Sequence, residues 1–192
     1  IINVHHDTGA DPDVWLVADP EIYQTVKTRY EGLWKQIAER FKSYDQRLLF
    51  ESYNEMLDES RSWCYASMNL GYDATEATKA YDAINSYAQS FVNVVRATGG
   101  NNAVRNLVVN TYGACNGSGT WNQHLPDPLI YMKKPVDTVE DHLLFQVHAY
   151  PLIDNLPSME IEVSEMFRLL NQHLVSQGGP VIIGEWGTFS EN

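Results

Sequence analysis

Two glutamates stand at the ends of short apolar segments, where their carboxyl groups could do acid–base or nucleophilic chemistry. Glu55 closes the segment FESYNE at residues 50–55, and Glu185 follows the apolar run VIIG at residues 181–184. Burial at the rim of a covered sheet raises the pKa of a carboxyl group, and a second carboxylate nearby raises one pKa further. Two such groups across a cleft can divide into a proton donor and a nucleophile, the arrangement that cleaves glycosidic bonds. Each glutamate taken singly could instead be a structural acid that pairs with arginine or caps a helix.

A second set of polar side chains lies on the segment at residues 144–150. Gln146, His148 and Tyr150 alternate along it, so in a strand all three point to the same face. They could contact a substrate, or they could be a hydrogen-bonded set below a loop. Glu51 shares a face with Glu55 by the same alternation but lies deeper, and we expect it to be a structural acid paired with an arginine inside the sheet.

The N-terminal segment NVHHD at residues 3–7 offers a metal-binding alternative. In a regular strand His5 and His6 point to opposite faces, so they cannot both bind one metal ion. The chain also has neither an HExxH motif nor a His-x-His spacing. We therefore predict no metal site, and a metal-dependent hydrolase ranks behind the other interpretations.

Aromatic residues and cysteines also fall in or beside the loops that follow strands. The apolar face of a sugar ring can stack on a tryptophan there, and the candidates are Trp63, Trp121 and Trp186. Trp34 lies inside a predicted helix and is expected to pack in the core. Cys64 and Cys115 follow strands that should be neighbours, so they form either a disulfide or two partly buried thiols.

The composition narrows the classes of protein. The chain has 192 residues, with 13 Lys and Arg against 25 Asp and Glu, a net charge of −12. A basic nucleic-acid-binding surface is therefore not expected. The 44% hydrophobic content argues against disorder. No apolar run approaches the roughly 20 residues that a membrane-spanning helix needs.

The elements that position these residues alternate between strand and helix. Short apolar strands are predicted at residues 1–6, 48–55, 107–114, 144–150 and 181–187, and helices at residues 20–41, 76–97 and 159–177. Asp19 is the predicted N-cap of the first helix and Pro20 its first residue. This alternation predicts an α/β fold with a parallel sheet, whose functional residues gather at the carboxyl ends of the strands.

Four of these segments together resemble the cellulase family of retaining glycoside hydrolases, family 5. The segments are NVHHD at residues 3–7, FESYNE at 50–55, VHAY at 147–150 and IGEWG at 183–187. They occur in the family's order, each at a strand end. The resemblance implies a (β/α)8 TIM barrel of which this chain holds strands three to seven, so that residues 1–192 form a partial catalytic domain.

The resemblance also implies a role for each matching residue. Glu55 would be the general acid/base and Glu185 the nucleophile. The expected substrate-site residues are Asn54 at the sugar 2-hydroxyl, His148 beside the acid/base, Tyr150 beside the nucleophile, and His5, His6, Trp121 and Trp186. Strict alternation puts Asn54 and Glu55 on opposite faces of a strand, so a bulge or the start of a loop must intervene if both reach the substrate.

The chain departs from the family pattern at three places. The family's arginine on strand two and its tryptophan after strand eight have no counterpart, and Met56 stands where many members have proline. The arginine supports the charge of the nucleophile and the tryptophan is a sugar platform. An inactive barrel fragment is therefore a second interpretation.

The function predicted from the sequence is retaining hydrolysis of a β-1,4-glucan such as cellulose, mixed-linkage glucan or xyloglucan. β-Mannan is the alternative substrate within the family. The non-catalytic interpretation is a fragment that binds glycan or self-associates through open strand edges. The partner is a polysaccharide, without nucleic acid or membrane, and the mechanism needs no metal or organic cofactor. A polymeric substrate further predicts a secreted or extracellular protein.

Overall fold

The computed structural model of the chain describes residues 1–61, 74–118, 129–151, 153–188 and 190. Strands and α-helices alternate in it, as predicted. The strands are β1 (Ile2–Asn3), β2 (Phe50–Glu51), β3 (Leu107–Asn110), β4 (Leu143–Ala149) and β5 (Val181–Trp186). The helices are α1 (Pro20–Phe41), α2 (Ala74–Ala97) and α3 (Leu156–His173), with 3₁₀ helices η2 (Gly100–Val104), η3 (Tyr112–Ala114) and η5 (Val175–Gln177).

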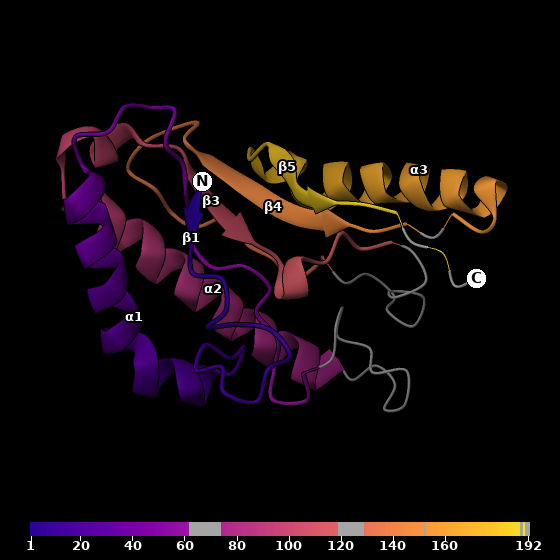
Figure 1. Cartoon of the computed structure of the whole chain (residues 1–192), viewed down its shortest axis with the longest axis horizontal. Helices are drawn as coiled ribbons and strands as arrows, with labels where there is room; N and C mark the ends of the chain where they lie inside the picture. Colours follow the sequence, from indigo (N-terminus) through magenta and orange to yellow (C-terminus); the bar gives the residue numbers. More distant parts are fainter. Residues whose placement is uncertain (62–73, 119–128, 152, 189, 191–192) are drawn as a thin grey trace.

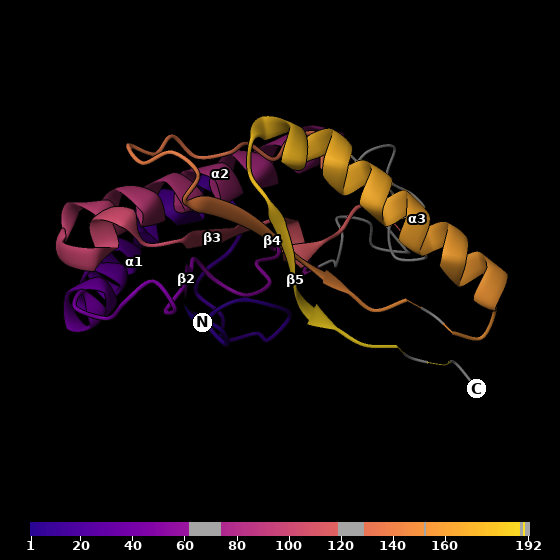
Figure 2. The same ribbon diagram turned by 90° about the horizontal axis from the view of Figure 1, so that it is seen from above.

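The five strands form one sheet in the order β1-β2-β3-β4-β5, and every neighbouring pair is parallel. Because crossovers between adjacent parallel strands are almost always right-handed, the connecting helices come to one face of such a sheet. Figure 1 and Figure 2 show α1 and α2 beside the β1–β3 end of the sheet and α3 running along β4 and β5. This is the arrangement of a partial (β/α)8 TIM barrel, and it brings the carboxyl ends of all five strands to one edge.

Helix α1 begins where its sequence signals predict. The Asp19 carboxylate accepts hydrogen bonds from the backbone N–H groups of Glu21 (2.8 Å) and Ile22 (3.1 Å), and Pro20 opens the helix. Helix α3 begins at Leu156, three residues before the predicted start, because Asn155 caps it by accepting from the backbone N–H of Ser158. None of the described helices combines the length and the apolar content needed to cross a bilayer.

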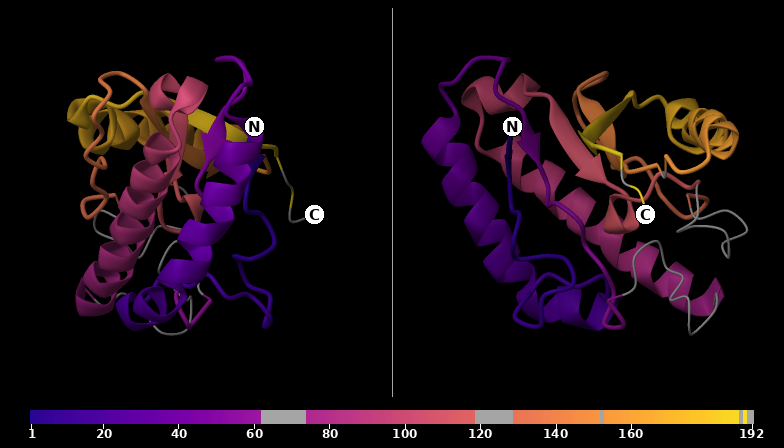
Figure 3. Two further views of the ribbon diagram at one scale, coloured as in Figure 1. Left: turned by 90° about the vertical axis from the view of Figure 1, so that its left-hand side faces the viewer. Right: turned by 45° about the vertical axis from the view of Figure 1, so that its right-hand side comes forward.

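Helices α1 and α2 lie side by side and pack on the strand that leads to Glu55 (Figure 3). Trp34 of α1 is fully buried, as predicted, and its ring contacts Phe91 of α2 edge-on with centroids 4.5 Å apart. The same ring lies 5.7 Å from that of Phe50 in β2. The indole Nε1 donates to the carbonyl oxygen of Ser52 at 3.0 Å. This packing fixes the chain just before it reaches the candidate acid/base.

Four of the five predicted strands are longer than the observed ones, above all at their carboxyl ends, whereas β4 has the predicted length shifted by one residue. The pattern extends three of them to residues 6, 55 and 114, whereas β1, β2 and β3 end at residues 3, 51 and 110. After β3 the chain turns away because Gly113 and Ala114 adopt positive φ angles of 54° and 51°. After β2, buried side chains such as Tyr53 and Met56 continue the apolar pattern outside the hydrogen-bonded ladder. Burial without strand pairing is what misled the prediction.

Candidate active site

Three side chains from separate segments of the chain converge at the carboxyl edge of the sheet. Glu55 lies four residues beyond β2, His148 is in β4 and Glu185 is in β5. The His148 Nδ1 lies 2.6 Å from Oε1 of Glu55 and 3.6 Å from Oε2 of Glu185. One ligand atom of each side chain lies within 4.8 Å of the other two. The structure therefore brings together the two glutamates that the sequence singled out, with an imidazole between them.

A β-bulge in β5 places Glu185 beside His148. Val147 of β4 pairs with Ile183, but the next residue, His148, pairs with Glu185, so Gly184 is the extra residue. Without this bulge Glu185 would pair with Ala149 and point to the opposite face of the sheet from His148. A Cβ atom on Gly184 would overlap the side-chain amide of Gln146, so the bulge also needs a glycine.

Tyr150 contacts the second carboxylate of the cluster. Its phenol donates a hydrogen bond to Oε2 of Glu185 at 2.8 Å. Partial burial, together with this hydrogen bond and the charges of Glu185 and Glu55, raises the pKa of Tyr150 to about 12. The phenol therefore stays protonated at neutral pH and remains a donor to Glu185.

Asn54 and Glu55 lie beyond the end of β2, which removes the alternation conflict between them. The Asn54 Nδ2 lies 3.5 Å from Oε2 of Glu55, and its backbone N–H donates to the carbonyl of Val4 at 3.0 Å. Its Oδ1 is buried and has no hydrogen-bond partner among the residues that the structure describes. This amide oxygen is thus an available acceptor beside Glu55.

Thr8 is a functional-site residue that sequence reasoning missed. Its hydroxyl accepts from the backbone N–H of Glu55 at 3.3 Å and donates to the carbonyl of His5 at 3.0 Å. Thr8 is buried although it lies in a polar loop, where nothing in the sequence distinguishes it from its neighbours. It ties the loop after β1 to the backbone of Glu55.

The two N-terminal histidines lie on that loop, outside the cluster. His5 and His6 are exposed, and their rings contact each other edge-on with centroids 4.8 Å apart. With Asp7 they do not form a converging set of metal ligands. Within the described ranges, the group of histidine and acidic side chains close enough to hold a metal ion is Glu55, His148 and Glu185.

The tryptophans and cysteines add little to the described site. Trp186 follows Glu185 in β5 and pairs with Ala149, so it points to the opposite face of the sheet, and its side chain is 79% exposed. Cys115 is buried. The other predicted residues of this kind lie outside the described residues: Trp63, Cys64 and Trp121.

Glu51 is buried, as a structural acid should be, but the prediction of an arginine partner is wrong. Its Oε1 accepts from Nδ2 of Asn110 (2.8 Å) and from Nε2 of Gln146 (2.5 Å), and its Oε2 accepts from Nδ2 of Asn3 (3.3 Å). Burial raises the pKa of Glu51, and the amide donors oppose that shift. Neutral amides can surround a carboxylate at the centre of the sheet without bringing in a second charge.

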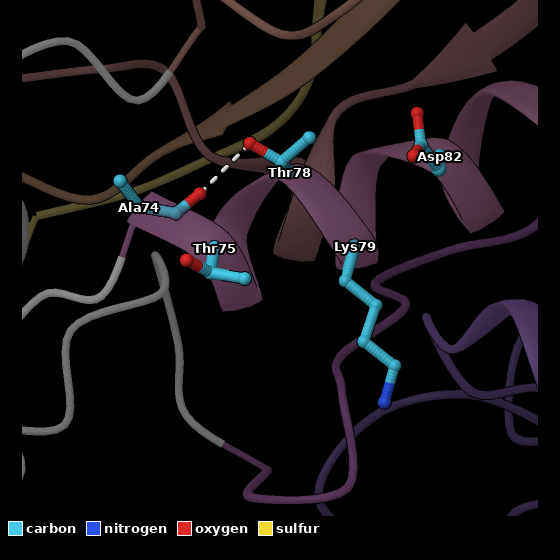
Figure 4. A pocket seen from close by; sticks show the side chains of 5 residues that line it. All are labelled: Ala74, Thr75, Thr78, Lys79 and Asp82. Carbon is cyan, nitrogen blue, oxygen red and sulfur yellow. Dashed lines mark hydrogen bonds between the residues drawn. The ribbon is translucent and has the colours of Figure 1, made fainter.

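A hollow at the start of α2 is separate from this cluster. Figure 4 shows its lining residues, all on α2: Ala74, Thr75, Thr78, Lys79 and Asp82. Lys79 extends away from the helix to the Asp19 carboxylate, 2.7 Å from its Nζ. None of the three converging side chains lines this hollow. The hollow is therefore not part of the candidate site, which remains the cluster of Glu55, His148 and Glu185.

Comparison with known sequences gives consistent relatives. Endoglucanase 1 of Ruminococcus albus is 33% identical over 202 residues, covering 100% of this chain and 43% of that protein. The xyloglucan-specific endo-beta-1,4-glucanase of Bacteroides ovatus is 30% identical over 211 residues, covering 97% of this chain and 37% of that protein. The chain thus spans less than half the length of these relatives.

Comparison with solved structures agrees. A GH5-4 broad specificity endoglucanase from an uncultured bacterium is 56% identical and superposes with a TM-score of 0.89, over 97% of this chain and 52% of that one. The sequence model described as Cellulase (glycosyl hydrolase family 5) matches residues 1–192. Since this match covers every residue and the fold agrees with it, the chain belongs to glycosyl hydrolase family 5, the cellulase family.

Proposed function

We propose that the protein is a retaining endo-β-1,4-glycanase that hydrolyses β-1,4-glucan. The observation that carries the proposal is the convergence of Glu55 and Glu185, since one carboxylate oxygen of each lies within 4.8 Å of one of the other. Retaining glycosidases keep their two carboxyl groups about 5–5.5 Å apart, because one must attack the anomeric carbon directly. Inverting enzymes need a wider gap to admit water.

In the proposed first step, Glu185 attacks the anomeric carbon while Glu55 gives its proton to the leaving glycosidic oxygen. The glycosidic bond breaks and a glycosyl ester with Glu185 forms. In the second step Glu55, now a carboxylate, takes a proton from water, and the resulting hydroxide replaces Glu185 at the anomeric carbon. Tyr150, donating at 2.8 Å, holds the nucleophile in place. His148, 2.6 Å from Glu55, positions the acid/base.

The substrate proposal follows the relatives and the unpaired acceptor near the acid/base. The relatives include a xyloglucan-specific enzyme and a broad specificity endoglucanase, which favours a β-1,4-glucan backbone. The Oδ1 of Asn54 is buried beside Glu55 and has unused acceptor capacity, and we assign a sugar hydroxyl as its donor in the complex. We assign the outer sugar contacts to His5, His6 and Trp121, and we leave Trp186 out of this assignment because it faces away from His148 and Glu185. A polymer outside the cell would require the protein to be secreted or extracellular.

The test is a reducing-sugar assay on carboxymethylcellulose, xyloglucan and mannan, run beside an intact-mass determination. Glu55→Gln should lower kcat by about 10²–10⁴-fold, the contribution of a general acid/base, and Glu185→Gln should abolish turnover. Glu160→Gln, at an exposed glutamate of α3, is the matched control and should keep full activity. Turnover that survives Glu185→Gln would remove Glu185 from the role of nucleophile.

Two other functions are separated by the same assay. A β-mannanase would act on mannan in preference to the glucans, since the carboxylate pair does not distinguish an equatorial from an axial 2-hydroxyl. A non-catalytic fragment would bind oligosaccharides without turnover, unchanged by Glu55→Gln. The ends of the sheet favour self-association in that case, because β1 and β5 each pair on one side only among the described strands.

A further inference from the structure

A buried chain of hydrogen-bonding groups runs from the centre of the sheet to the candidate acid/base. It begins at Glu51, which is 2% exposed, and continues to Gln146, which is also 2% exposed. The Gln146 Nε2 lies 2.5 Å from Oε1 of Glu51 and 3.4 Å from Nε2 of His148. His148 in turn contacts Oε1 of Glu55 through its other ring nitrogen, at 2.6 Å. Neither of the first two residues hydrogen-bonds to Glu55 or Glu185 in the described chain, and Gln146 reaches Glu55 through His148. Glu51 also shares the Asn110 amide with the backbone oxygen of Asn54.

Glu51 determines which way the Gln146 amide points. An ionised carboxylate only accepts hydrogen bonds, and the partners of Glu51 in the described chain are three amide nitrogens, those of Asn3, Asn110 and Gln146. If the Gln146 amide were turned over, its oxygen would face the Glu51 carboxylate at hydrogen-bond distance, which is repulsive. The amide nitrogen is therefore held between Glu51 and the imidazole.

The orientation of this amide in turn selects a tautomer of His148. An amide nitrogen carries two hydrogens, so Gln146 can give one to Glu51 and direct the other at Nε2 of His148. That ring nitrogen must then offer its lone pair, and the proton of the neutral imidazole must be on Nδ1. An Nδ1–H group is the donor that the Glu55 carboxylate needs at 2.6 Å. While Glu55 is a carboxylate, the opposite tautomer would set two lone pairs against each other at that contact.

The bulge glycine provides the space that this arrangement requires. Gly184 lies against the Gln146 amide, and a Cβ atom there would overlap Cδ, Nε2 and Oε1 of that side chain. Gly184 thus has two roles. As the bulge residue it turns Glu185 toward His148, and because it has no side chain it leaves room for the Gln146 amide that orients the His148 ring.

We propose that Glu51 and Gln146 are positioning residues that hold His148 as the Nδ1–H tautomer, with its proton directed at Glu55. The tautomer of His148 can be tested whether or not the protein is a glycanase. The effect of that tautomer on turnover rests on the proposed function. The two claims therefore have separate readouts.

The direct test is long-range ¹H–¹⁵N NMR of the histidine rings, with His148 identified among the six histidines by its loss in His148→Gln. The intact protein at neutral pH should show a protonated Nδ1 and an unprotonated Nε2 for this ring. Finding the proton on Nε2 in the unmodified protein would overturn the proposal without any further variant.

Two variants then test the cause. Gln146→Met keeps the volume but removes the amide, and Glu51→Gln keeps the shape but removes the acceptor-only carboxylate; each should shift His148 toward the Nε2–H tautomer. Asn116→Ala is the matched control, because its amide donates to the backbone oxygen of His148 at 2.8 Å and accepts from Ser118, without touching the ring, and its removal should leave the ring unchanged. A folded Gln146→Met protein that keeps the wild-type tautomer contradicts the proposal.

Kinetics separate this proposal from the proposed function. If the protein is a glycanase, Gln146→Met should lower kcat about 10–100-fold with little change in KM, the range seen when outer hydrogen-bond partners of ligating histidines are removed. A tautomer shift in a protein that never turns over glycan would sustain the positioning role and reject the enzyme assignment. Unchanged kcat in a variant whose tautomer has shifted would reject the link between Gln146 and turnover.

Discussion

The two ends of the parallel sheet use their polar groups in different ways. At the amino end, Arg105 is fully buried beside β3 and donates five hydrogen bonds, four of them to backbone carbonyls of the segment at residues 41–48 and one to Asn102. At the carboxyl end, the side chains of Glu55 and Glu185 are 20% and 35% exposed. At the amino end, the donors of Arg105 are all paired within the protein. At the carboxyl end, the carboxylates of Glu55 and Glu185 remain partly exposed to solvent.

The ion pairs repeat this difference. Arg96 and Asp137 are 2.7 Å apart near the amino end, with side chains only 9% and 4% exposed, and Arg96 also donates to the carbonyls of Asn102 and Arg105. At the carboxyl end no arginine contacts Glu55 or Glu185 among the described residues. In barrels of this kind the carboxyl end carries the chemistry and the amino end carries stability. Substitutions at the two ends should therefore affect different measurements.

The largest effect on stability is expected from Arg105→Met. The methionine leaves the Leu48 carbonyl and the Asn102 amide oxygen without their donor, and each unsatisfied buried group costs about 1–3 kcal/mol. The carbonyls of residues 41, 44 and 45 each lose one of two donors, and the contact of the guanidinium with the Phe50 ring is lost as well. We expect a loss of more than about 4 kcal/mol in the free energy of unfolding, measured by urea denaturation. Arg168→Met, at an arginine whose side chain is 55% exposed on α3, is the control and should change stability little. If Arg105→Met and Arg168→Met lost the same free energy of unfolding, the buried hydrogen bonds at the amino end would contribute no particular stability.

Asp137→Asn should have the next largest effect, and one that depends on pH. Leaving the buried charge of Arg96 without its partner costs about 3–5 kcal/mol. Burial raises the pKa of Asp137, but the hydrogen bonds and charge of Arg96 outweigh it, so that pKa lies below its ordinary value. The stability from the pair is therefore present above the unfolded-state pKa of about 3.9 and is lost as the pH falls through the folded-state pKa.

The measurement for Asp137→Asn is urea unfolding of both proteins from pH 7 down into acid. The difference between their unfolding free energies should be largest at neutral pH and shrink below pH 4 or so, because the carboxylate of the unmodified protein is then protonated. A difference that stays constant across this range would show that the Arg96–Asp137 charge pair is not its source.

The smallest free-energy change is expected at the carboxyl end, from Tyr150→Phe. This variant removes the phenol that donates to Glu185 at 2.8 Å, and a hydrogen bond to a charged group contributes about 1.5–3 kcal/mol. If the protein is a glycanase, kcat should fall about 10–100-fold. The unfolding midpoint should change little, because Tyr150 is 43% exposed and water can replace the phenol as the donor to Glu185. Tyr44→Phe, at a half-exposed tyrosine near the amino end, should leave kcat unchanged. A large loss of unfolding free energy in Tyr150→Phe would contradict the view that residues at the carboxyl end contribute to activity rather than to stability.

The sequence was most informative where local chemistry decides the structure. The cap at Asp19 predicted the first residue of α1, and the apolar period after it runs to Phe41, where the helix ends, because both signals act within one or two turns of a helix. The apolar runs located all five strands, but not their lengths, since a residue such as Tyr53 is equally buried inside or outside a ladder. Where a strand ends depends on how far it pairs with the adjacent strand of the sheet, which its own sequence does not record.

The sequence alone thus determined the strand–helix order, the polar residues at strand ends and the membership of Glu55, His148, Tyr150 and Glu185 in one family pattern. Only the tertiary structure decided how these side chains meet. The bulge at Gly184, the amides around Glu51 and the tie from Thr8 to Glu55 each join segments at least 35 residues or so apart in the chain. Contacts of that range arise from the packing of complete strands, and no short sequence pattern records them.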